Sequence, residues 1–258
     1  MLSLAVIPAA GAAPSLPIDT TGGAHFAVLV PKTAPLDLAE MAIIANEGSI
    51  VKHWSQIGVI IARSKRVDFA TKVRSERGGA GAGATRNKAE LGPRSHDFVS
   101  VLPRVEEHTP RSQRAPATTE PLAVNQWNTK LIGADRANEI NQGSRDVLVG
   151  ILDSGIDSSH PDLKANIDKS ASVNCTNAGV PDTTESASQD DVGHGTHVVG
   201  IVAAAKNGVG VTGVAPNVRL ASVKVGGREG FIHPESAICG YVWAADHRRG
   251  HRQHLTGD

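Results

Sequence analysis

The pattern of apolar and polar positions predicts a first structured region near the N-terminus. It indicates strands at 25–30, 50–54 and 58–64, and helices at 36–48 and 67–76. Gly48 is expected to end the first of these helices. This β-α-β-β-α order is that of a ferredoxin-like unit, which closes with a fourth strand. The sequence that follows, GGAGAGATRN, is poor in strand-forming residues, so closure of the sheet is not predicted.

A second structured region begins near residue 125. VLVGILDSGID, residues 147–157, is a continuous apolar run that Asp and Gly bring to an end, as expected for a parallel strand buried on both faces. VRLASVKV, residues 218–225, predicts a second buried strand. Helices are predicted over 194–204 and 236–247. Strands that alternate with helices predict an α/β fold with a mainly parallel sheet.

Two further segments are predicted to lie outside these regions. Residues 92–124 are rich in Pro, Ser, Thr and Arg, and we interpret them as an exposed, cleavable linker. Residues 1–15 contain a short apolar run and an Ala-x-Ala pattern, as at the end of a secretory signal peptide, although a basic n-region is missing. An unstructured start is the alternative. The run is too short to span a membrane. We therefore interpret residues 1–15 as the end of a signal peptide and expect the protein to be exported.

Composition excludes some classes of partner. The 26 acidic and 26 basic side chains balance, and only 3% of residues are aromatic, so neither a nucleic acid nor a membrane is indicated as a partner. Cys175 and Cys239 are the only cysteines. An exported protein could pair them, but two unpaired thiols fit the sequence equally well.

The chemistry of the sequence centres on one carboxylate and one imidazole. Asp153 ends a predicted buried strand, the place where catalytic groups gather in open α/β sheets. His194 opens a predicted helix in DDVGHGTHVVG, between Gly193 and Gly195, which keep the approach to its ring clear. The carboxylate can accept the Nδ1 proton of the imidazole, which leaves the other ring nitrogen as a general base.

ILDSGID, GHGTHVVGIVAA, GVTGVAP and VRLASVKV, in this order, resemble the subtilisin-like serine proteases, or subtilases. The resemblance implies that Asp153 is the triad aspartate and His194 the general base. It also implies an N-terminal ferredoxin-like propeptide (α+β) over residues 22–91. The first part of a three-layer αβα domain would follow over residues 125–247. No cofactor is certain, and a structural calcium ion is possible in the intact family.

The same resemblance bears on further residues. Gly230, Phe231, Ile232 and His233 occupy the region where the family pairs the substrate backbone as an added strand, although a plain surface loop remains open. Other polar residues receive structural interpretations: helix packing for His197, a solvated loop rather than a calcium site for Asp190 and Asp191, and the turn after the catalytic strand for Asp157, His160 and Asp162.

Two elements of a subtilase site are missing from the 258 residues. No Gly-Thr-Ser-Met-Ala-like stretch is present, nor an asparagine placed to hold the oxyanion, so we expect that this chain does not hydrolyse peptide bonds. Residues 248–258 depart from the family pattern, and we interpret the chain as a precursor truncated by a frameshift. The intact enzyme would act on a protein or peptide and bind its own propeptide.

Two alternatives remain beside the truncated protease. The first is a propeptide-type protease inhibitor or folding-assistant module. The second is a metal-binding tail that uses His247, His251 and His254, which we disfavour because arginines between the histidines repel a cation.

Overall fold

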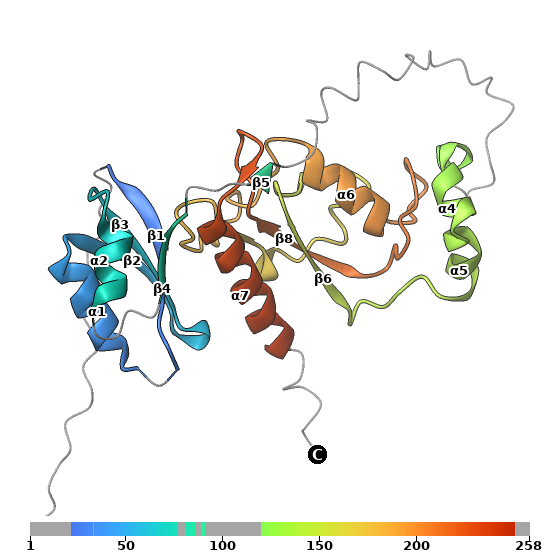
Figure 1. Ribbon diagram of the computed structural model, residues 1–258. Coiled ribbons are helices and arrows are strands. Elements are labelled where there is room, and N and C mark those ends of the chain that lie inside the picture. Colours follow the sequence, from blue (N-terminus) through green and yellow to red (C-terminus); the bar gives the residue numbers. More distant parts are fainter. Residues whose placement is uncertain (1–21, 33, 77–80, 86–88, 91–119, 251–258) are drawn as a thin grey trace, which may run out of the picture.

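The computed structural model describes residues 22–32, 34–76, 81–85, 89–90 and 120–250 (Figure 1). The leader-like segment 1–15, most of the predicted linker and tail residues 251–258 lie outside the described residues. Within the described ranges, no helix is both long enough and apolar enough to cross a membrane.

The N-terminal unit is a four-stranded antiparallel sheet with two helices on one face (Figure 1). Its strand order is β2-β3-β1-β4. Phe26 and Phe69 pack with tilted rings, 4.7 Å between their centroids, in the core between sheet and helices. The elements are β1 (Ala24–Leu29), α1 (Leu36–Ala45), β2 (Gly48–Trp54), a 3-10 turn (Ser55–Ile57), β3 (Val59–Ser64), α2 (Phe69–Ser75) and β4 (Gly81–Ala84).

Two details of this unit differ from expectation. The stretch thought too poor in strand formers provides β4, which pairs with β1 from Phe26 opposite Ala84 to Leu29 opposite Gly81. Pairing at a sheet edge needs only backbone groups, and Ala82 supplies the apolar contact with the core. The first helix ends at Ala45, because Glu47 turns the chain with a φ of 60°, and Gly48 already belongs to β2.

The second unit is built on a parallel sheet of order β6-β8-β7. β6 lies at the edge of this described sheet, and its residues are mostly half-buried rather than buried on both faces as predicted. The elements are a 3-10 turn (Ala123–Asn125), α4 (Trp127–Leu131), α5 (Ala134–Ile140), β6 (Leu148–Asp153), a 3-10 turn (Lys169–Ala171), β7 (Val173–Asn174), α6 (His194–Ala203), β8 (Arg219–Lys224), β9 (Phe231–Ile232) and α7 (Pro234–Gly250).

Both ends of this unit differ from the predicted boundaries. The described part of this unit begins at residue 120, inside the predicted linker, and the Glu120 side chain is buried. Helix α7 continues to Gly250, three residues past His247, so the departure from the family pattern does not stop the helix. The His247 ring stacks on Trp243 at 4.1 Å, and its Nδ1 bonds the Trp243 carbonyl, which gives this histidine a packing role.

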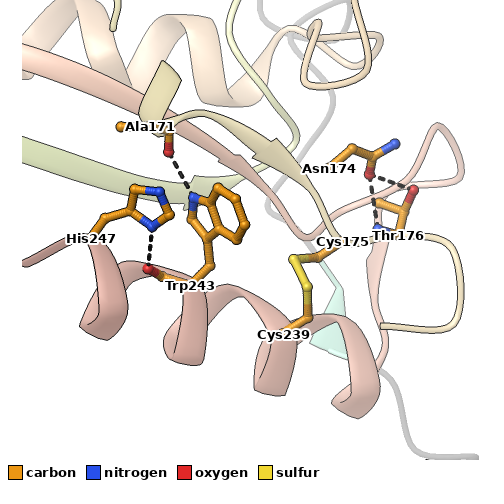
Figure 2. Close-up of a disulfide and its surroundings, with 7 residues drawn as sticks. All are labelled: Ala171, Asn174, Cys175, Thr176, Cys239, Trp243 and His247. Atoms are coloured by element: carbon orange, nitrogen blue, oxygen red, sulfur yellow. Dashed lines mark hydrogen bonds between the residues drawn. A yellow bond between two sulfur atoms is a disulfide. The ribbon is translucent and has the colours of Figure 1, made fainter. Parts of the chain in front are cut away.

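A disulfide fixes α7 to the parallel sheet (Figure 2). Cys175 follows β7, Cys239 lies in α7, and the two residues, whose pairing the sequence left open, are bonded with 5.7 Å between their Cα atoms. One helical turn further on, Trp243 donates from Nε1 to the carbonyl of Ala171 at 2.8 Å. These two ties hold α7 against the face of β7 and β8.

The N-terminal unit packs against α7 and its surroundings (Figure 1). Trp54, Val59 and Ile61, on the face of the antiparallel sheet away from its helices, belong to the same buried cluster as Val223 and Val242. At the margin, His25 of β1 bonds Glu235 at the start of α7, with 3.3 Å between Nδ1 and Oε1. The two units therefore share an apolar interface with a polar contact at its edge.

Candidate active site

Asp153 is the last residue of β6, and backbone amides of the next residue and of the chain after β8 fix its position. Its carbonyl accepts hydrogen bonds from the backbone N–H groups of Val225 at 2.8 Å and Gly226 at 3.0 Å, just past the end of β8. Its side-chain Oδ1 accepts a 2.7 Å bond from the N–H of Ser154. The carboxylate is therefore oriented at the C-terminal edge of the sheet, as predicted.

His194 is the first residue of α6 and meets Asp153 directly. The His194 Nδ1 and Asp153 Oδ1 atoms are 2.7 Å apart. Gly193 precedes the helix with a φ of 93°, which favours glycine, and Gly195 approaches the turn after Asp153 so closely that a Cβ there would lie 2.2 Å from the Gly155 carbonyl oxygen. The two glycines of GHG thus allow the helix start to reach the strand end.

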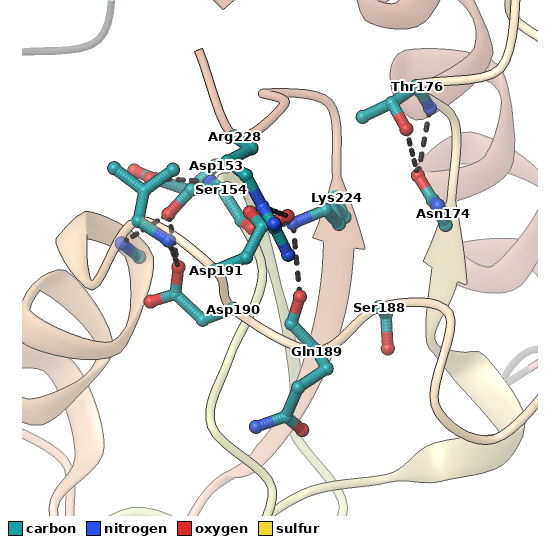
Figure 3. A network of polar contacts seen from close by, with 12 residues as sticks. Asp153, Ser154, Asn174, Thr176, Ser188, Gln189, Asp190, Asp191, Lys224 and Arg228 are labelled. Atoms are coloured by element: carbon teal, nitrogen blue, oxygen red, sulfur yellow. Dashed lines mark hydrogen bonds and ion pairs between the residues drawn. The ribbon is translucent and has the colours of Figure 1, made fainter. Parts of the chain in front are cut away.

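Asp190 anchors the segment that leads to His194 (Figure 3). Its Oδ1 accepts bonds from the Ser154 hydroxyl and from the Val192 and Gly193 amides, and its Oδ2 accepts bonds from the amide and hydroxyl of Thr196. Burial raises the pKa of this carboxyl, but the bonds from Thr196, Gly193 and Val192 outweigh it and hold the pKa below the ordinary 3.8. The solvated-loop interpretation of Asp190 was therefore wrong, since this carboxylate joins the strand end to the first turn of α6.

Lys224 is a buried cation beside the pair, and its role was not predicted from the sequence. It ends β8 directly opposite Asp153, and its ammonium donates to the Ser154 carbonyl, the Gln189 carbonyl and Asp191 Oδ1 (Figure 3). Asp191, an exposed residue of the loop before α6, is thus also the counter-ion of this ammonium. The signal available in the sequence was a lysine between two valines near the end of a predicted buried strand, VRLASVKV.

Gly230, Phe231, Ile232 and His233 lie between β8 and α7, and two of them form strand β9. β9 pairs antiparallel with β5 (Ala89–Glu90), with Ala89 opposite Ile232 and Glu90 opposite Phe231. Phe231 and Ile232 therefore form a strand that accepts an extended segment of the same chain, rather than a plain loop.

The remaining polar residues named from the sequence lie away from the pair. His197 is an exposed residue of α6. Asp157 Oδ1 accepts bonds from the amide and hydroxyl of Ser159, and His160 Nδ1 accepts one from the amide of Asp162. These contacts shape the turn after β6.

Calcium, the ion that the resemblance leaves possible, fits one place in the described chain. Two buried carboxylate oxygens, Glu120 Oε2 and Asp162 Oδ1, have no hydrogen-bond partner among the described residues. The other oxygen of each bonds one loop: Gly208 N–H donates to Glu120 and Val211 N–H to Asp162. Hard cations prefer such oxygens, so Glu120 and Asp162 would hold the ion and with it this loop. In the described ranges no cluster of three or more His, Cys, Asp or Glu side chains forms a metal site.

Comparison with known proteins agrees with this geometry. Residues 144–252 match the Subtilase family. The alkaline protease of Alkalihalobacillus alcalophilus is 38% identical over 157 residues, which cover 61% of this chain and 37% of that protein. Subtilisin Savinase of Lederbergia lenta is 41% identical over 120 residues, covering 46% of this chain and 40% of that protein. The chain thus spans well under half the length of these relatives.

The fold has a counterpart among solved structures. Fervidolysin from Fervidobacterium pennivorans, described as a keratinolytic enzyme related to subtilisin, matches with a TM-score of 0.62 and 22% sequence identity. The match covers 88% of this chain and 34% of that one. Together with the sequence matches to the two proteases, the family match places residues 144–252, which include Asp153 and His194, among the subtilisin-like serine proteases, the subtilases.

Proposed function

We propose that this chain carries the acid–base part of a serine-type endopeptidase, with Asp153 as the triad aspartate and His194 as the general base. The observation that carries the proposal is the 2.7 Å contact between His194 Nδ1 and Asp153 Oδ1. It joins a side chain that is 11% exposed to one that is 28% exposed. The carboxylate is thus largely shielded while the imidazole still reaches the surface.

The mechanism follows from which ring nitrogen is occupied. Nδ1–H of His194 donates to Asp153, so in an intact enzyme of the family the lone pair of Nε2 would take the proton of the nucleophilic serine, which these 258 residues do not supply. The serine oxygen then attacks a peptide carbonyl and an acyl-enzyme forms, while Asp153 stabilises the imidazolium. His194 returns the proton to the leaving amine.

The 258 residues contain no subtilase-type nucleophile motif, and we propose that this polypeptide does not turn over peptides by itself. Removal of the nucleophile alone costs about a million-fold in kcat in a related site. The test is hydrolysis of casein and of a fluorogenic peptide by the purified chain, beside His194→Ala. Activity that His194→Ala abolishes would contradict catalytic incompleteness. Equal activity in both proteins indicates a contaminating protease.

The pair itself is tested by NMR of histidine-labelled protein. A proton on Nδ1 that is held by a carboxylate exchanges slowly with water and resonates far downfield. We expect this resonance for His194, assigned through its loss in His194→Gln, and we expect it to disappear in Asp153→Ala. Its absence from the parent protein would refute the pair as an acid–base unit.

A second candidate function, a propeptide-type inhibitor and folding assistant, is supported by how residues 22–90 lie on the rest of the chain. We propose that this unit is a ferredoxin-like propeptide, since its β-α-β-β-α-β order and antiparallel sheet suit that description. The pairing of β5 with β9 suggests that Gly230, Phe231, Ile232 and His233 bind substrate backbone in the same way.

Inhibition distinguishes this candidate. Purified residues 22–92 should inhibit a mature subtilase at micromolar concentration, and an absence of inhibition there counts against the propeptide role.

Export is part of the same proposal. It is supported by residues 1–15 and by the Cys175–Cys239 disulfide, because disulfides persist mainly in oxidising compartments.

A further inference from the structure

Lys224 is a buried charge that lies directly beside the Asp153–His194 pair without belonging to it. The residue is 4% exposed. Its ammonium has three donors and finds three acceptors: the Ser154 carbonyl at 2.5 Å, the Gln189 carbonyl at 3.0 Å and Asp191 Oδ1 at 2.7 Å. Burial of an ammonium is costly, and a site that supplies every acceptor offsets that cost.

These three acceptors belong to the two segments that carry the pair. Ser154 directly follows Asp153, and its amide donates to the same Asp153 Oδ1 atom that bonds His194. Gln189 and Asp191 belong to the segment that runs into α6 and ends at His194. One ammonium therefore holds the carbonyl of Ser154, the residue whose amide orients the carboxylate, and also the segment that leads to the imidazole.

No apolar side chain of similar length could replace these contacts. A methionine would fill the space but would leave two carbonyls and one carboxylate at this position without their donor. The charges that face the site from its surroundings are Asp191, and beyond it Arg228, whose Nε lies 3.8 Å from Asp191 Oδ2. Backbone bonds between Ile156 and Ser188 and between Asp190 and Ile156 would still hold the two segments together without Lys224. What Lys224 adds is orientation.

We infer that Lys224 is a positioning residue for the Asp153–His194 pair, acting through the Ser154 carbonyl and the 189–191 segment. The inference rests on the proposed function, because it concerns the hydrogen bond that makes His194 a general base. A merely structural lysine would change the stability of the fold without changing the protection of that bond.

The test uses the full chain and measures the exchange rate of the His194 Nδ1 proton with water. In Lys224→Met we expect this rate to rise at least tenfold, or the resonance to be lost, with an unchanged far-ultraviolet circular dichroism spectrum. Asp191→Asn, which keeps an oxygen acceptor for the ammonium, should stay within twofold of the parent. Asn166→Ala removes buried side-chain bonds to Ala203 and Pro216, far from the start of α6, and serves as the control for lost stability.

Each result has one meaning. Protection in Lys224→Met within twofold of the parent overturns the inference, and so does an equal loss of protection in Asn166→Ala. If Lys224→Met does not fold, Lys224→Gln keeps part of the hydrogen bonding. An exchange rate in that variant at least threefold above the parent supports the inference, and parental protection overturns it. If the parent chain shows no protected proton between about pH 5 and 8, the proposed function fails and the inference fails with it.

Discussion

Removal of the Cys175–Cys239 disulfide should destabilise the second unit by several kcal/mol. The bond closes a loop with a sequence separation of 64, which contains all of α6 and β8. For a loop of this length, the lost entropy of the unfolded chain corresponds to about 4 kcal/mol at 25 °C. Both cysteines are fully buried, so Cys175→Ala/Cys239→Ala adds a small packing loss. At roughly 2–4 °C per kcal/mol, the melting temperature should fall by about 8–16 °C.

The assay is thermal and urea unfolding of the parent and of the double variant, each with and without reductant. With reductant, the melting temperature of the parent should approach that of the variant once unfolding has exposed the disulfide. Reductant should not change the melting temperature of the variant. A melting temperature within about 2 °C of the parent in the double variant would refute the reasoning, because it would mean that the covalent tie adds little beyond the apolar packing of α7.

Three further predictions concern single residues. Asp190 has a lowered pKa, so its contribution to stability is fully present above about pH 4 and is lost as pH falls through the folded value; in pH-dependent urea unfolding, Asp190→Asn should lose most of that dependence. Gly195→Ala should lower the free energy of unfolding by about 3 kcal/mol or prevent folding, because the new Cβ would clash with the Gly155 carbonyl oxygen. The control is Gly200→Ala in the same helix, whose Cβ contacts nothing. It should raise the free energy of unfolding by up to about 1 kcal/mol in the same urea assay. Calcium should raise the melting temperature and chelation should lower it, and Asp162→Asn should remove the response.

Much of the architecture could be predicted from local pattern. The strands and helices of the first unit followed from apolar periodicity. Asp153 and His194 could be located because the first ends an apolar strand and the second begins a helix. β4 was missed, since a Gly–Ala strand pairs through its backbone and carries no side-chain signal. The partial exposure of β6 was missed because an apolar run does not reveal how many neighbours a strand has.

Polar roles were harder to predict than elements. Asp190 and Asp191 are adjacent in sequence and look alike, yet one accepts five bonds at the start of α6 and the other balances a buried ammonium. The roles of Asp190 and Asp191 differ because the fold brings together three segments that are distant in the sequence, around residues 154, 190 and 224. Side-chain contacts of this kind depend on tertiary arrangement, which neither periodicity nor composition encodes.

The contacts that build the pair are separate from those that attach the N-terminal unit. Among the described residues, the hydrogen bonds to the side chains of Asp153, His194 and Lys224 come from the second unit, between Asp153 and Lys224 in the chain. The N-terminal unit instead contacts α7 and strand β9. If residues 22–90 act as the proposed propeptide, the hydrogen bonds of the pair do not depend on contacts with that unit. A unit of this kind would control access to the site rather than the chemistry of His194.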